Sequence, residues 1–210
     1  MCKKRIVLAL MISLSALCAC SRSYISDRDM DIYEKLHRYY NEMESFSATL
    51  EITAYSNKTE NTYVAEQKVI CPDLYFMKIG DKSGNFSVTT IQNGETVKTA
   101  VDGSDYALTV PGQDSTGMLF VNRFFERYYA SEDTVLSVSH AGKGRVTVLE
   151  TVLPENHPQM SRAKLTVDNE TLAPIEILLT DEEGAVVLKG TFLDFTYNDT
   201  VNREIFTTDT

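Results

Sequence analysis

The residue types that most often carry catalysis or bind metals are few and scattered in this sequence. Its three histidines, His37, His140 and His157, lie far apart, and none is followed two or four residues later by His, Cys, Asp or Glu. Gly142-Lys143-Gly144 joins two β-branched segments and is not followed by a helix, so it lacks the helix N-terminus of a phosphate site. The sequence therefore predicts no catalytic residue, no metal site and no cofactor.

One acidic segment, Asp181-Glu182-Glu183-Gly184, could attract a cation. Calcium takes six or more oxygen ligands, which a single acidic turn does not supply. We expect a solvated turn at this position.

The N-terminus has the pattern of a secretory leader. Lys3, Lys4 and Arg5 precede an apolar segment, residues 6–17, that is shorter than a comfortable membrane span. The sequence Leu17-Cys18-Ala19-Cys20 then resembles a bacterial lipobox, a signal in which diacylglycerol is attached to the cysteine and the leader is cut before it. We expect Cys20 to be the lipid anchor. An ordinary signal peptide that contains cysteine and an uncut N-terminal anchor are the alternatives.

These features predict three segments: a lipoprotein signal peptide (1–19), a polar tether (20–28) and one domain (29–210). Cys71 would be the only unmodified thiol of the mature chain, which excludes an intrachain disulfide and a zinc site of the paired-cysteine kind. Because Cys71 falls at a predicted strand end, we expect it to be buried and inert.

Charge restricts the partners further. The leader contains three of the 20 basic residues and none of the 30 acidic ones, so the mature chain has 17 basic and 30 acidic residues and a net charge of −13. Such a chain is not expected to bind nucleic acid or to adhere electrostatically to anionic lipid. Membrane attachment would then depend on the acyl chains of Cys20.

Most of the domain has the pattern of β-strands. Between residues 46 and 54, small or apolar residues alternate strictly with polar ones, which predicts an antiparallel strand with one buried face. Asn93-Gly94 and Asp102-Gly103 are typical of two-residue hairpin turns, in which we expect both central residues to have positive φ. The further strands are expected over 62–71, 74–79, 86–92, 95–101, 106–110, 134–140, 145–153, 163–168, 175–180 and 185–195.

Two helices are expected among these strands, over residues 29–44 and 117–130. The first has an apolar stripe at helical spacing, formed by Ile32, Leu36, Tyr39 and Met43. The second is apolar on most sides, through Met118, Leu119, Phe120, Val121, Phe124, Phe125, Tyr128 and Tyr129. The fold class is therefore mostly β (α+β): a single curved antiparallel sheet with both helices on its concave side.

Three segments resemble the LolA/LolB-like lipoprotein-localisation family: 64–79 (VAEQKVICPDLYFMKI), 91–97 (IQNGETV) and 165–177 (LTVDNETLAPIEI). The resemblance implies an incomplete barrel whose open, apolar mouth is crossed by helices. Because a lipobox precedes the domain, the chain is most similar to an anchored branch, the clostridial spore germination lipoproteins called GerS.

That branch implies a non-catalytic lipoprotein that binds and supports a cell-wall (cortex) N-acetylmuramoyl-L-alanine amidase, or a similar envelope protein, during spore germination. The alternative is a carrier or receptor for lipoprotein acyl chains or another hydrophobic ligand. We expect the protein to be held outside the cytoplasm on the cell membrane through Cys20. Partners would dock at sheet edges and exposed aromatics, and edge strands would also allow a homodimer by strand exchange.

Overall fold

The structure, a computed structural model, describes residues 31–56, 58–84, 86–103, 107–111, 115–141, 144–153 and 160–207; of residues 107–111, 115, 116 and 141 it describes the backbone alone. The chain forms two compact units, Met1–Lys35 and Leu36–Thr210. Of the first unit, only residues 31–35 are described, and they include the start of helix α2 (Ile32–Asn41). The sheet belongs entirely to the second unit.

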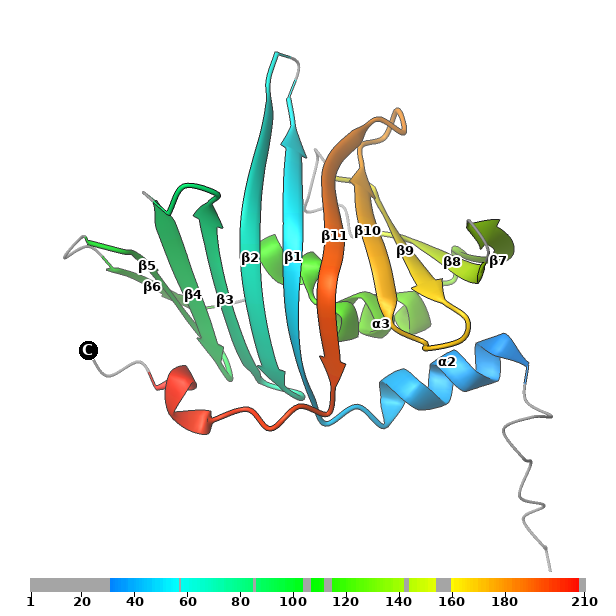
Figure 1. The fold of residues 1–210 in the computed structure, drawn as a ribbon, viewed down its shortest axis with the longest axis horizontal. Coiled ribbons are helices and arrows are strands. Elements are labelled where there is room, and N and C mark those ends of the chain that lie inside the picture. The colour runs from blue at the N-terminus through cyan, green and yellow to red at the C-terminus, as the bar shows by residue number, and fades with distance from the viewer. Residues whose placement is uncertain are drawn as a thin grey trace, which may run out of the picture. The chain divides into compact units, whose positions relative to one another are not determined.

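The described strands form one antiparallel sheet in the order β6-β5-β4-β3-β2-β1-β11-β10-β9-β8-β7 (Figure 1). The first strand therefore pairs with the last, and β6 and β7 are the two open edges. The strands are β1 (Ser45–Tyr55), β2 (Glu60–Ile70), β3 (Leu74–Asp81), β4 (Ser87–Asn93), β5 (Thr96–Val101), β6 (Ala107–Pro111), β7 (Thr134–Ala141), β8 (Gly144–Val152), β9 (Arg162–Asp168), β10 (Pro174–Thr180) and β11 (Val186–Tyr197).

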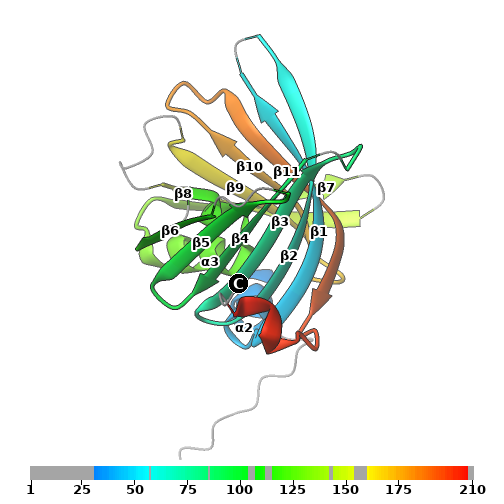
Figure 2. The ribbon, with the colours of Figure 1, turned by 90° about the vertical axis from the view of Figure 1, so that its left-hand side faces the viewer.

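The sheet is curved and not closed, and its concave face is covered by a 3-10 helix, η2 (Ser115–Leu119), and helix α3 (Val121–Ala130) (Figures 1 and 2). In β1, Phe46, Ala48, Leu50 and Ile52 are buried on this face, as the alternation predicts. The expected fold class, a mostly β protein with one curved antiparallel sheet and two helices, is confirmed.

The strand next to β1 shows how closely the layers pack. A Cβ placed on Gly190 of β11 would lie 2.9 Å from Ile177 Cγ2, 3.3 Å from Leu50 Cδ2 and 3.6 Å from Leu119 Cδ2. A side chain at position 190 would therefore displace Ile177 of the neighbouring strand β10, and glycine avoids this clash.

The first helix is shorter than the expected 29–44. It begins at Ile32, because the Asp31 carboxylate accepts a hydrogen bond from Glu34 N (2.9 Å) and so caps the first turn. It ends at Asn41, because the backbone of Glu44 bonds elsewhere: its N–H donates to Asn198 Oδ1 (2.8 Å) and its carbonyl accepts from Cys71 N (2.8 Å). Residues 29 and 30 lie outside the described residues.

The second predicted helix, 117–130, is divided in two. Phe120 has an extended conformation, with φ −85° and ψ 125°, and separates η2 from α3. A continuous α-helix would use the Leu119 carbonyl for the N–H four residues on, but this carbonyl accepts a hydrogen bond from Gln67 Nε2 (3.2 Å). The hydrogen bond from Gln67 of β2 therefore takes the place of the hydrogen bond that a continuous helix would form at the Leu119 carbonyl.

The first predicted hairpin turn is displaced by one residue. Asn93 pairs with Thr96, so Gly94 and Glu95 are the central turn residues, and of these only Gly94 has positive φ (59°). The expectation of positive φ at Asn93 is wrong. A glycine at the first central position is typical of the type II′ turn, the second common two-residue hairpin turn. The Asp102-Gly103 turn continues into residues outside the described part.

The chain end crosses below the sheet, from the end of β11 to β3 and β4 (Figure 1). Asn198, at φ 51°, starts this crossing, and Ser45 Oγ donates to the carbonyl of Asp199 (2.7 Å). A 3-10 helix, η3 (Arg203–Phe206), then buries Phe206 completely. Phe206 thus anchors this last described segment in the core.

Candidate functional site

The concave face of the sheet is filled by aromatic side chains of the chain itself. Phe120, Phe124, Phe125 and Tyr128 are all buried. Phe125 stacks on Tyr40 of α2 with ring centroids 3.9 Å apart. Phe120 also packs on Tyr75 of β3 at 5.0 Å, so these rings form an aromatic layer between α3 and its neighbours.

A polar cluster lies inside this layer, between β2, β3 and α3. Asn122 Nδ2 donates to the hydroxyl of Tyr75 (2.7 Å), and the guanidinium of Arg123 lies 4.4 Å from the centre of the same ring. Burial raises the pKa of Tyr75 well above its usual value, an effect that nearby Arg123 opposes. The phenol therefore stays neutral and acts as a structural hydrogen-bonding group.

Gln67 is the buried polar residue that the sequence prediction missed. It is fully buried, and neither its Oε1 nor Asn122 Oδ1 has a hydrogen-bond partner among the described residues. The alternation of Ala65, Gln67 and Val69 does place Gln67 on the buried face of β2, so the signal was present in the sequence.

The second half of α2, from Leu36 onward, is fixed by tyrosines. The hydroxyl of Tyr40 donates to the carbonyl of Leu172 (2.7 Å), and Tyr39 stacks on Tyr197 at 4.1 Å. Burial, reinforced by Tyr197, raises the pKa of Tyr39 to about 12, and burial also raises that of Tyr40. Tyr40, which lies next to the predicted apolar stripe in sequence, is buried in the core.

The structure places the two described histidines, His37 and His140, on different elements. His37 lies on α2 against the ring of Tyr129, His140 is exposed on β7, and His157 lies outside the described residues. In the described part of the chain, no group of three or more His, Cys, Asp or Glu side chains could hold a metal. The Asp181 carboxylate instead accepts from the backbone N–H groups of Glu183 (3.0 Å) and Ala185 (2.8 Å), as in an ordinary turn.

Cys71 is half-buried, not fully buried as expected, because it lies in the turn just after β2 ends. Burial is the main cause that raises the pKa of its thiol to about 11, with a further contribution from Glu126 and an opposing one from Arg123. At neutral pH the thiol is protonated and therefore weakly nucleophilic. Cys20 lies outside the described residues, so its lipidation remains a prediction, as do the boundaries at 19/20 and 28/29.

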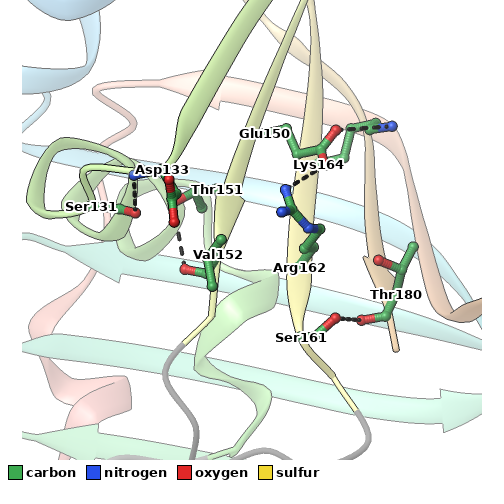
Figure 3. Close-up of polar contacts among 9 residues, drawn as sticks. All are labelled: Ser131, Asp133, Glu150, Thr151, Val152, Ser161, Arg162, Lys164 and Thr180. Carbon is green, nitrogen blue, oxygen red and sulfur yellow. Dashed lines mark hydrogen bonds and ion pairs between the residues drawn. The ribbon is translucent and has the colours of Figure 1, made fainter. Parts of the chain in front are cut away.

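Several ion pairs join neighbouring strands on the outer face of the sheet. Figure 3 shows Glu150 of β8 between two cations of β9, Arg162 Nη1 at 3.1 Å and Lys164 Nζ at 3.2 Å. Burial raises the pKa of Glu150, but the hydrogen bonds and charges of Lys164 and Arg162 outweigh it and lower the pKa. Similar pairs join Lys78 to Asp102 and Lys189 to Glu176. Such exposed pairs contribute little to stability. They place positive and negative side chains next to one another on this face.

Exposed aromatics of the sheet domain include Tyr55 at the end of β1 and Phe86 just before β4. The open edges β6 and β7 are the other surfaces that the sequence prediction named for partners. Among the described residues, no helix is both long and apolar enough to span a membrane.

A curved, open antiparallel sheet with a helix packed across its concave face is a LolA-like fold. A crystal structure of an uncharacterised conserved protein from Thermus thermophilus shares this fold, with 11% identity, 85% of this chain and 92% of that chain covered, and a TM-score of 0.55. No curated protein sequence matches the chain.

Two further matches are to proteins of the kinds that the sequence resemblance named. One is the GerS lipoprotein of Clostridioides difficile, solved in complex with the CwlD amidase (21% identity, 82% and 99% covered, TM-score 0.47). The other is the LolA superfamily protein NE2245 of Nitrosomonas europaea (12% identity, 85% and 98% covered, TM-score 0.44). The chain itself belongs to the sporulation protein YdcC-like family, whose model matches residues 2–206.

Proposed function

We propose that this protein is a non-catalytic lipoprotein, anchored through Cys20, that binds and supports a cell-wall amidase during spore germination. The observation that carries the proposal is membership of a sporulation family over residues 2–206. The amidase is the partner implied by the resemblance to the germination lipoproteins, which rests on the lipobox that precedes a LolA/LolB-like domain.

The packing of the concave face favours a protein-binding role over that of an acyl-chain carrier. A carrier needs an apolar cavity that is open to its ligand. Here Phe124, Phe125 and Tyr128 are buried against the sheet and against one another, with Phe124 and Tyr128 stacked at 6.0 Å. Opening such a cavity would expose these rings to water, at a cost of roughly 1.5–3 kcal/mol for each side chain.

The non-catalytic part of the proposal rests on the scattered chemistry of the chain. His37 and His140 lie on α2 and on β7, at separate places in the fold, and the Cys71 thiol is protonated at neutral pH. The amidase would therefore supply the catalytic residues, and this chain would supply a docking surface and a membrane anchor.

Deletion of the gene tests the role in the cell. We expect spores that form normally but do not degrade their cortex, because the amidase lacks its supporting protein. The purified full chain should release no products from peptidoglycan by itself. Cortex degradation at the normal rate in the deletion strain would overturn the proposal.

A pull-down of the full chain from sporulating cells tests the partner. Mass spectrometry of proteins and lipids in the same eluate should find an amidase in near-equal amount. Phe86→Ala, which removes an exposed ring, should weaken this recovery, whereas Val186→Ala removes an exposed apolar side chain elsewhere and serves as the control. Recovery of a stoichiometric acyl lipid without a protein partner would support the carrier instead.

A further inference from the structure

The edge strand β7 lacks the features with which proteins usually protect a sheet edge. It pairs regularly with β8 over its whole length, from Thr134–Thr151 to Ala141–Gly144, without a bulge. Its sequence, TVLSVSHA, contains no Lys, Glu or Pro, and Val135 and Val138 are exposed. Flat, uncharged edges of this kind are templates for pairing with another strand.

The hydrogen bonds of β8 show which β7 backbone groups face outward. The carbonyl of Arg145 accepts from Asn169 N (3.0 Å), so the backbone of Arg145 points away from β7. Its partner His140 is therefore in a non-hydrogen-bonded pair, because backbone groups alternate in direction along an antiparallel strand. It follows that Thr134, Leu136, Val138 and His140 present their N–H and C=O groups to the open edge.

The charged residues at the two ends of β7 have opposite signs, so the edge of one copy is complementary to the same edge of a second copy. Glu132 and Asp133 immediately precede β7, and Arg145 lies opposite His140 at its other end. In an antiparallel pair of two β7 strands, the acidic end of each strand lies beside the basic end of the other hairpin. We propose that β7 pairs edge to edge with β7 of a second copy of this chain.

The alternation of the strand determines the register. A two-fold axis at Ser137 places Leu136 opposite Val138 of the second copy and Thr134 opposite its His140. These are the residues with outward-facing backbone groups, so they form the hydrogen-bonded pairs. The axis also keeps the two concave faces on the same side of a continuous sheet. No strand leaves its own domain, which distinguishes this dimer from strand exchange.

A cysteine on the axis provides a direct test. Ser137 would form a non-hydrogen-bonded pair with itself, with the two Cα atoms about 4.5 Å apart. When the full chain is oxidised in intact cells, the S137C variant should form much more disulfide-linked dimer than the unsubstituted chain does. The matched control is S139C, on the same face of the same strand, whose two copies would lie about 14 Å apart and beyond disulfide reach.

The outcomes of this test are distinct. Cross-linking of S137C but not of S139C supports the proposed register. Equal cross-linking of both variants, no cross-linking of either, or cross-linking of S137C only to a different protein would overturn the proposal.

Co-purification of two differently tagged copies provides a second measurement that does not depend on disulfide chemistry. Val138 is 40% exposed, so V138K should leave the fold intact while placing a like charge twice in the interface. Recovery of the second tag should fall about tenfold, a change of 1.4 kcal/mol in binding. V186K, at a 37% exposed position of β11, should leave recovery unchanged. Unchanged recovery with V138K would overturn the proposal.

Discussion

Truncation of Phe125 tests the packing of the concave face. The side chain is 3% exposed and lies in the centre of the aromatic layer. It stacks on Tyr40 at 3.9 Å with an interplanar angle of 21° and contacts Phe124 edge-on at 5.6 Å. Phe125→Ala would remove the ring that connects α3 to the second half of α2.

The cost has two parts, the lost burial of the ring and the cavity that remains. Phe→Ala substitutions at fully buried positions cost about 3–5 kcal/mol. The rings around Phe125 belong to two helices, Tyr40 to α2 and Phe124, Tyr128 and Tyr129 to α3, and they cannot all move into the space. We therefore expect a value near the upper end, about 4 kcal/mol. A domain with a total stability of roughly 5–15 kcal/mol would lose a large fraction of it.

Urea unfolding of the full chain in mild detergent measures this change. Because the sequence contains no tryptophan, near-ultraviolet circular dichroism of the tyrosines is a suitable signal. Phe86→Ala is the matched control: Phe86 is 46% exposed, so the same substitution should cost less than about 1 kcal/mol. If Phe125→Ala and Phe86→Ala shift the unfolding free energy equally, α3 does not pack on the sheet as described.

Three further predictions follow from other parts of the chain. Gly190→Val should destabilise the protein by about 1–3 kcal/mol in the same urea assay, because its Cβ would lie 2.9 Å from a neighbouring side chain; an unchanged midpoint would contradict the packing. Cys20→Ala should release the protein from the membrane fraction or block its maturation, whereas Cys71→Ala should leave fractionation unchanged; normal processing and membrane retention of the first variant would refute the anchor. The pKa of Asp168 is lowered, mainly by the hydrogen bond that its carboxylate accepts from the Thr171 backbone. The ionised carboxylate therefore stabilises the folded protein at pH values above the pKa that Asp168 has in the unfolded chain. This stabilisation is lost as the pH falls through the lower pKa that Asp168 has in the folded protein. Asp168→Asn should therefore reduce the loss of stability between pH 5 and pH 3, and identical pH profiles would count against it.

The sequence was sufficient to predict the strands because their signal is local. Alternation along residues 46–54 gives the buried face of β1 directly, and the same rule applies to Ala65, Gln67 and Val69 in β2. The family resemblance added the curvature of the sheet.

The ends of the helices could not be predicted in this way. Helical periodicity continues through Phe120, but the Leu119 carbonyl is taken by Gln67, which is 52 residues away in the sequence. The first helix likewise ends at Asn41, because the backbone N–H of Glu44 donates to Asn198, which is 154 residues away in the sequence. A local pattern contains no information about such partners.

The candidate interaction edge also depends on tertiary structure. Sequence alternation identifies 134–140 as a strand, but not its place in the sheet. β7 becomes an edge because β1 pairs with β11, which places β7 and β6 at opposite ends of the order. Strand order is decided by contacts between residues far apart in the chain, such as those of β1 with β11, and a local pattern does not record them.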